Sequence, residues 1–328
     1  MASPSDDLPS AFENDYLVRK GLCPVTQIRH QAEPLESHSL YFEQHGWGTE
    51  YKVIFIMGLN SSGFAWGPQV KHFAPSDSHT ILVYDNRGVG NSGYPRGPYT
   101  TAGMAEDAIV LLDYIGWTEK RGVHVVGVSL GGMIAQELAS RIPERIASLS
   151  FIVTTPGGYF WQNLPPWKGV RSLATLMFTP DIAKKTPIVM EMLFTSNWLK
   201  EKAKDDSQGR TNFQVQTEEY IRRMSITKPQ QFMGHISQMF AAVMHRVTPD
   251  RLGAISRSIP KVTIVTGDVD NLVLPYHSHD IKASMPEAEF VQWEDTGHGI
   301  HVQRADLLNA LLERTFKEGK KRSAAESA

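Results

Sequence analysis

A chain of 328 residues, 41% of them hydrophobic, can bury a large core as one large domain or as one domain with an insertion. The formal net charge of -2 and the pI near 6.6 provide no broad basic surface, which argues against nucleic acid and anionic membranes as partners. The single cysteine, Cys23, cannot form an internal disulfide, and no apolar stretch approaches the roughly 18 residues of a membrane-spanning helix.

The N-terminal segment lacks the basic and apolar regions of a signal peptide, so we expect a cytoplasmic protein, either a monomer or a homodimer. Residues 1–20 are polar and acidic and predict a flexible arm. Two candidate strands follow at residues 25–30 and 40–45. Their position is typical of the antiparallel edge that precedes a parallel sheet.

The chain is organised around residues 123–132, which read Val-His-Val-Val-Gly-Val-Ser-Leu-Gly-Gly. The β-branched run at its start predicts a buried parallel strand, and residues 133–138 predict a helix, so Ser129 falls on the sharp turn between them. A serine lifted clear of a sheet on so tight a turn needs neighbours without side chains, and Gly127 and Gly131 meet that need. The pattern is that of a nucleophile elbow.

With this motif, its strand and its helix, the chain resembles the α/β-hydrolase family over roughly residues 52–316. The resemblance implies an α/β fold with a mostly parallel, doubly wound sheet and a helical cap inserted after the sixth strand. We expect the core to comprise residues 21–155 and 259–317, the cap residues 156–258, and a disordered tail residues 318–328. The strand and helix alternation before residue 155 separately predicts a parallel sheet with ligands at the carboxyl ends of its strands.

A glycine-rich loop at residues 58–63 follows the first strongly apolar strand. By family resemblance, the backbone N–H groups of Leu59 and Leu130 form an oxyanion hole. Family members usually carry a histidine before Gly58, where this chain has Met57. Because the donors belong to the backbone, we expect the hole to persist, although the loop lacks a side chain that helps to hold it.

A second glycine-rich stretch follows the strand at residues 81–84, and Gly88, Gly90 and Gly93 literally satisfy a dinucleotide fingerprint. That fingerprint must open directly into a helix, whereas the first helical pattern here begins only near residue 101. The stretch also resembles the Asp-x-Arg-Gly-x-Gly-x-Ser turn of α/β-hydrolases, in which Asp85 and Arg87 tie loops together. We prefer this scaffolding interpretation and keep a nicotinamide-binding oxidoreductase as an alternative.

The alternation of strands and helices stops between residues 156 and 258, where helical patterns occur at residues 170–177, 187–199, 218–225 and 229–244. So long an insertion predicts a small helical subdomain, which the family places over the nucleophile. Methionine and aromatic residues crowd into it, which suggests an apolar, adaptable substrate pocket. Most of them are expected to be packing residues, and the candidates for lining the pocket are Met177, Met190, Phe194, Phe232 and Met239.

The sheet resumes at residues 261–266 and 289–293, and an acid and then a histidine follow these two strands. Serine, acid and histidine, each just past a strand end, is the order of the α/β-hydrolase triad, which selects His298. The usual spacing in the family selects Asp270 as the acid, with Asp268 as the alternative.

Three further histidines follow Asp270. His277 and His279 alone do not make a zinc site, because no carboxylate or cysteine cluster lies at ligand spacing, so we expect no metal and no cofactor. His301 is expected to line the entrance or to face solvent.

These residues together predict a serine hydrolase that cleaves a carboxylic ester or lactone with an apolar part through an acyl-enzyme intermediate. Two other chemistries on the same triad stay open, namely carbon-carbon bond hydrolysis and acyl transfer. A third alternative is a hydrolase-fold ligand receptor with little turnover. The expected partner is a small apolar ester or lactone.

Overall fold

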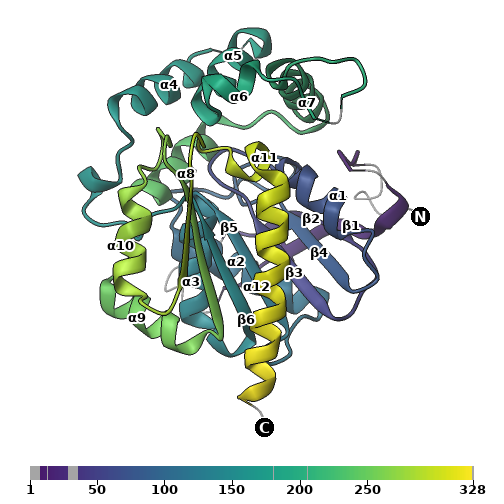
Figure 1. Ribbon diagram of the computed structural model, residues 1–328, viewed down its shortest axis with the longest axis vertical. Helices are drawn as coiled ribbons and strands as arrows, with labels where there is room; N and C mark the ends of the chain where they lie inside the picture. The colour runs from purple at the N-terminus through teal and green to yellow at the C-terminus, as the bar shows by residue number, and fades with distance from the viewer. Residues whose placement is uncertain (1–7, 13, 29–35, 180, 205, 327–328) are drawn as a thin grey trace.

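The computed structural model describes residues 8–12, 14–28, 36–179, 181–204 and 206–326. At its centre lies an eight-stranded sheet in the order β1-β2-β4-β3-β5-β6-β7-β8 (Figure 1). The β1/β2 and β2/β4 pairs are antiparallel and the other five are parallel, which confirms the mostly parallel sheet. The strands are β1 (Leu17–Val25), β2 (His38–His45), β3 (Tyr51–Ile56), β4 (His79–Tyr84), β5 (Val123–Val128), β6 (Ile146–Ile152), β7 (Lys261–Gly267) and β8 (Glu289–Trp293).

Helices cover both faces of the sheet because successive strand residues point to opposite sides. In β3, Ile54 and Ile56 join one hydrophobic cluster, whereas Val53 and Phe55 join the other. The first cluster includes side chains of α2 (Thr101–Ile115), α3 (Leu130–Arg141), α9 (Pro249–Ser258) and α10 (Tyr276–Ser284). The second includes those of α1 (Gly67–Phe73), α11 (Ile300–Gln303) and α12 (Ala305–Ala325), the long yellow helix of Figure 1.

A helical insertion separates β6 from β7, as the sequence predicts. It contains α4 (Trp167–Met177), α5 (Ile182–Leu193), α6 (Ser196–Lys200), α7 (Asn212–Ile226) and α8 (Phe232–Val243). In Figure 1, α4 to α7 form a layer beyond the strand ends, and α8 lies between that layer and the sheet. None of the helices in the described part of the chain combines the length and the hydropathy needed to span a bilayer.

The cap ends earlier than residue 258. Helix α9 lies inside the segment expected to be cap, but its Leu252 and Ile255 are buried in the first hydrophobic cluster of the core. Its Arg251 also donates to the Glu137 carboxylate on α3 at 2.9 Å. Helix α9 is therefore a core helix, because its apolar face packs into the first hydrophobic cluster on one face of the sheet and not over the site.

The N-terminal boundary also differs from the prediction. The first strand is Leu17–Val25, which pairs with β2 with a register shift between Leu17 and Arg19. It lies earlier than residues 25–30 and includes the end of the expected arm. Before it, Phe12 packs edge-on against Phe64 with ring centroids 5.4 Å apart. Residues 8–12 are thus held by aromatic packing, and residues 1–7, 13 and 29–35 lie outside the described part of the chain.

The sequence predicts a disordered tail from residue 318, but α12 continues to Ala325. Gly319 packs so closely on β6 that a Cβ there would lie 2.6 Å from the carbonyl oxygen of Ala147. Lys320 reaches Glu50 at 2.9 Å, and Arg322 donates to the carbonyl of Pro260 at 3.1 Å. The polar sequence extends the helix because it docks on the edge of the core; residues 327–328 are not described.

Candidate active site

Ser129 occupies the turn between β5 and α3. Its φ of 56° and ψ of -121° lie in a region that residues with side chains rarely adopt, so the turn needs external support. The Ser129 N–H donates to the carbonyl of Ile152 at 2.9 Å, and the Thr154 hydroxyl donates to the carbonyl of Ser129 at 2.7 Å. The strained residue is thereby tied to β6 and to the residues that follow it.

The glycines on either side of Ser129 are required by close backbone approach. A Cβ on Gly131 would overlap the carbonyl oxygen of Ile56, and one on Gly127 would overlap the carbonyl oxygen of Gly131. The neighbours without side chains that the sequence predicts are therefore a steric necessity. They let α3 begin directly against the end of β3.

The loop after β3 passes beside the Ser129 side chain. A Cβ on Gly58 would lie 3.0 Å from the Ser129 Cβ and 3.6 Å from its Oγ. Leu59, the expected oxyanion donor, is the next residue and is half-buried. Leu130, the other expected donor, is the first residue of α3, where an N–H has no partner within the helix.

His298 follows β8 and pairs with Asp270, which follows β7. The Nδ1 of His298 and the Oδ2 of Asp270 are 2.7 Å apart, and the Asp270 side chain is fully buried. The other carboxylate oxygen, Oδ1, accepts the N–H groups of Leu272 at 2.8 Å and Val273 at 3.0 Å. Both oxygens of the carboxylate thus have partners, and the imidazole is held at Nδ1.

Asp268 has a different environment from Asp270. Its side chain is exposed, and its Oδ1 accepts the N–H of Thr296 at 3.1 Å. It therefore caps the loop after β8 rather than contacting His298. Of the two acids that the sequence leaves open, the geometry pairs Asp270 with the histidine.

The three expected groups follow strands of one parallel sheet, in which β5, β6, β7 and β8 are neighbours. Carboxyl ends of parallel strands share one edge, so Ser129, Asp270 and His298 all lie at that edge. At this edge the N–H of Val153, just after β6, donates to the carbonyl of Val265 in β7 at 2.8 Å. Such a set offers a hydroxyl, an imidazole and a buried carboxylate, the components of a base-activated nucleophile.

Helix α5 of the cap meets the histidine loop directly. The Gly299 N–H donates to the carbonyl of Leu193 at 2.7 Å, and the Phe194 ring packs on the bare face of Gly299. Phe194 therefore contacts the residue that follows His298. Of the five apolar side chains expected to line a pocket, it is the one whose contact with the site is direct.

The other four candidates have different surroundings. Met190 is 1% exposed and packs in the cap's own cluster with Val189, Phe194 and Leu199, so its place in the pocket stays a prediction. Phe232, the first residue of α8, is 59% exposed and is not enclosed. Met177 and Met239 are half-buried on α4 and α8.

The second glycine-rich stretch wraps around a carboxylate. Asp85 accepts the N–H groups of Gly63 and Asn91, both at 2.7 Å, and a Cβ on Gly90 would overlap its Oδ2. Arg87 pairs through two nitrogens with Asp107. These contacts confirm the predicted scaffolding role. Helix α2 begins only at Thr101, so the stretch does not open directly into a helix as a dinucleotide fingerprint must. Burial raises the pKa of Asp85 to about 7, although the two N–H donors oppose that shift.

The other histidines make structural contacts. The Nδ1 of His277 lies 3.0 Å from the Thr155 hydroxyl, and burial lowers its pKa. His279 lies 3.1 Å from the amide oxygen of Gln292. His301 neither lines an entrance nor faces solvent, because it is 8% exposed with its ring 5.1 Å from that of Trp66. Among the described residues, no group of three or more His, Cys, Asp or Glu could hold a metal ion.

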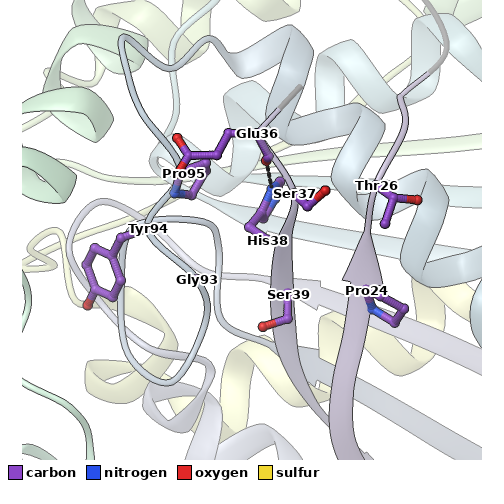
Figure 2. A pocket seen from close by; sticks show the side chains of 9 residues that line it. All are labelled: Pro24, Thr26, Glu36, Ser37, His38, Ser39, Gly93, Tyr94 and Pro95. Atoms are coloured by element: carbon purple, nitrogen blue, oxygen red, sulfur yellow. Dashed lines mark hydrogen bonds between the residues drawn. The ribbon is translucent and has the colours of Figure 1, made fainter. Parts of the chain in front are cut away.

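A shallow hollow of about 390 Å³ lies elsewhere, between the β1–β2 edge and the loop at Gly93 (Figure 2). Its polar lining includes Glu36 and His38, and the His38 ring lies 3.2 Å from the backbone oxygen of Glu36. Ser129, Asp270 and His298 are not among its lining residues. The hollow is therefore separate from the candidate active site.

Two amide side chains near the site were not identified from the sequence. The Asn86 Nδ2 donates to the carbonyl of Met57 at 2.9 Å, and the Gln238 Oε1 accepts the N–H of Asn60 at 2.9 Å. Asn86 lies inside the Asp85–Arg87 motif, so its position was a usable signal. Gln238 is 178 residues from Asn60 in the chain, and no local pattern marks it.

A family model described as "Alpha/beta hydrolase family" matches residues 45–311. A Caulobacter segnis protein named "Putative carbamate hydrolase RutD" is 26% identical over 285 residues, covering 85% of this chain and 96% of the relative.

Two solved structures have similar backbones. A thermophilic esterase from Thermogutta terrifontis superposes with a TM-score of 0.69 at 18% identity, covering 91% of this chain and 98% of the esterase. The enol-lactonase from Burkholderia xenovorans superposes with a TM-score of 0.68 at 20% identity, covering 85% and 97%. At these identities the structures establish a shared fold.

Proposed function

This chain belongs to the alpha/beta hydrolase family, and from that premise we propose that it is a serine hydrolase that cleaves carboxylic esters or lactones. The observation that carries the proposal is the 2.7 Å contact between His298 and the buried Asp270, at the sheet edge where Ser129 occupies a strained turn. A carboxylate at Nδ1 leaves Nε2 of the imidazole as the proton acceptor, which is what a serine nucleophile requires.

The proposed reaction has two halves. The Ser129 Oγ attacks the carbonyl carbon while His298 takes its proton, and the oxyanion is stabilised by the N–H groups of Leu59 and Leu130. The C–O bond to the leaving alcohol breaks as His298 returns the proton to that oxygen, leaving an ester on Ser129. Water, deprotonated by His298, then attacks this ester and releases the acid and the free serine.

Apolar neighbours support a substrate with an apolar part. Phe194 packs on Gly299, the residue after His298. Leu272, two residues after Asp270, lies against Gly169 in the first turn of α4. The nucleophile argues against epoxide hydrolase and haloalkane dehalogenase chemistry, since members of this fold with those activities place an aspartate where Ser129 stands. Because a relative is named a carbamate hydrolase, carbamates belong in the substrate panel.

The test compares the wild type with Ser129→Ala on p-nitrophenyl esters from acetate to octanoate, on lactones and on carbamates. We expect turnover and fluorophosphonate labelling in the wild type, and neither in Ser129→Ala at unchanged circular dichroism. Ser150→Ala is the matched control, since this buried serine on β6 has an Oγ without a hydrogen-bond partner among the described residues. Labelling that persists in Ser129→Ala contradicts the proposal, and tight ligand binding with only a single burst favours a receptor.

A further inference from the structure

The loop that passes beside Ser129 is held by side-chain amides from outside it. The Asn86 Nδ2 donates to the carbonyl of Met57 at 2.9 Å, just before the loop. From the cap, the Gln238 Oε1 accepts the Asn60 N–H at 2.9 Å, and the Gln230 Nε2 donates to the Asn60 Oδ1 at 2.9 Å. The residue that carries two of these three contacts is therefore Asn60.

Gln238 is fully buried and uses both ends of its amide. While Oε1 accepts from Asn60, Nε2 donates to the carbonyl of Arg87 at 2.7 Å. Arg87 is itself fixed by its paired contact with Asp107. Gln238 thus bridges the loops that follow β3 and β4, and a buried amide with both partners satisfied has one orientation.

Asn60 has a φ of 56°, in the left-handed region that asparagine adopts more readily than most residues with side chains. Its N–H belongs to the peptide unit that shares the Cα of Leu59 with the unit bearing the Leu59 N–H. Fixing one unit restricts the rotation of the other about that Cα. The bond to Gln238 also occupies the Asn60 N–H, so the loop presents the neighbouring Leu59 N–H to an oxyanion.

We propose that Gln238, on helix α8 of the cap, is a positioning residue that holds the oxyanion loop, with Gln230 as a weaker second support. The inference rests on the proposed serine hydrolase function. Family members usually carry a histidine at the position of Met57, and that side chain helps to hold the loop. In this chain the amide of Gln238 would supply the missing support. A consequence is that α8 must stay docked on the core during turnover, whatever α4 to α7 do.

The principal test is Gln238→Met, which keeps the length of the side chain and removes both hydrogen bonds. A displaced oxyanion donor costs transition-state stabilisation, so we expect kcat for p-nitrophenyl butyrate to fall on the order of 10- to 100-fold with KM within about threefold. Affinity for an aryl trifluoromethyl ketone, which forms a tetrahedral adduct, should fall by a similar factor. Amide exchange of Asn60, followed by mass spectrometry of peptides from this loop, should become at least about tenfold faster.

Asn163→Leu is the matched control, because Asn163 precedes α4 and holds the other end of helix α8. The Asn163 Nδ2 donates to the carbonyls of Val243 at 2.7 Å and His245 at 2.8 Å, at the opposite end of α8 from Gln230. Its loss loosens α8 without touching Asn60, so we expect a lower Tm, near-normal kcat and unchanged exchange at Asn60. If Gln238→Met does not fold, Gln230→Leu is the milder variant to use, because the Gln230 side chain is only half-buried. We expect Gln230→Leu to lower kcat on the order of threefold.

The outcomes separate the two proposals. Unchanged kcat and unchanged Asn60 exchange in a folded Gln238→Met overturn the positioning role, as does an equal loss of kcat in Asn163→Leu. If the wild type turns over no ester and takes no label at Ser129, the serine hydrolase proposal fails. The exchange comparison then still decides whether Gln238 holds the loop.

Discussion

Replacing Asp270 with asparagine removes one negative charge, and the neighbouring hydrogen-bond donors determine the orientation of the new amide. In Asp270→Asn, the N–H groups of Leu272 and Val273 point at the position of Oδ1, so the amide oxygen occupies that position. The amide nitrogen then faces His298 Nδ1 across 2.7 Å and donates to it. The imidazole is forced to carry its proton on Nε2, where it can no longer accept a proton from Ser129.

The expected loss follows from this wrong tautomer. In a Ser-His-Asp triad the same change typically lowers kcat on the order of 10⁴-fold, or about 5.5 kcal/mol at 1.36 kcal/mol per factor of ten. We expect a comparable loss of kcat for p-nitrophenyl butyrate with KM within about threefold. The fold should persist, because both backbone N–H groups keep their acceptor.

Asp268→Asn is the matched control, two residues away. Asp268 is exposed and caps Thr296 through a single 3.1 Å hydrogen bond, so its kcat should stay within about threefold of the wild type. The assay is steady-state turnover with a Tm for each variant. A larger loss in Asp268→Asn than in Asp270→Asn, or less than a tenfold loss in Asp270→Asn, refutes the reasoning.

Three further predictions concern the loop, the core and the C-terminal helix. Gly58→Ala brings a Cβ within 3.0 Å of the Ser129 Cβ, so kcat should fall at least about tenfold with little change in circular dichroism; full activity would contradict this close approach. His124 is buried and its pKa is lowered to about 3 from 6.5, so it favours folding fully above pH 6.5 and less as the pH falls toward 3. Urea unfolding should show that the wild type loses about 2 kcal/mol more than His124→Gln between pH 7 and pH 5, and parallel pH profiles would refute this. Gly319→Val should lower the Tm by several degrees, because α12 packs on the carbonyl of Ala147; an unchanged Tm would mean that this end of the helix is not docked.

Local sequence patterns were sufficient for the elements that position the site. The β-branched run before Gly127 and the helix pattern after Gly131 identified the turn at Ser129, since glycine was sterically required at both positions. The order of acid and histidine after two apolar strands predicted His298 and an acid at position 268 or 270, and the spacing usual in the family favoured Asp270. These features are encoded within a few residues, so they could be predicted without knowledge of the tertiary structure.

Features that depend on distant contacts could not be predicted. The extension of α12 depends on the close contact of Gly319 with β6. The assignment of α9 to the core depends on the burial of Leu252 and Ile255 in the first hydrophobic cluster. Met190 and Phe194 are both apolar cap residues, but one fills the cap and the other meets Gly299. Composition cannot separate them, because both roles favour the same residue types.

The supports of the oxyanion loop illustrate the same limit. The Met57 position showed that a usual support was missing, but its replacement comes from a cap helix 178 residues along the chain from Asn60. A single glutamine on an amphipathic helix resembles any other polar residue until its partners are known. Burial and two satisfied hydrogen bonds distinguish it.

The central claim is that Ser129 forms a covalent acyl intermediate. We would mix the wild-type protein with p-nitrophenyl butyrate, quench it with acid on the millisecond to second scale, and locate any added mass by peptide mapping. The account predicts a butyryl group on Ser129 that appears with the first burst of p-nitrophenol and disappears as the ester is consumed. Steady turnover with no adduct on Ser129, or an adduct on another residue, would contradict it.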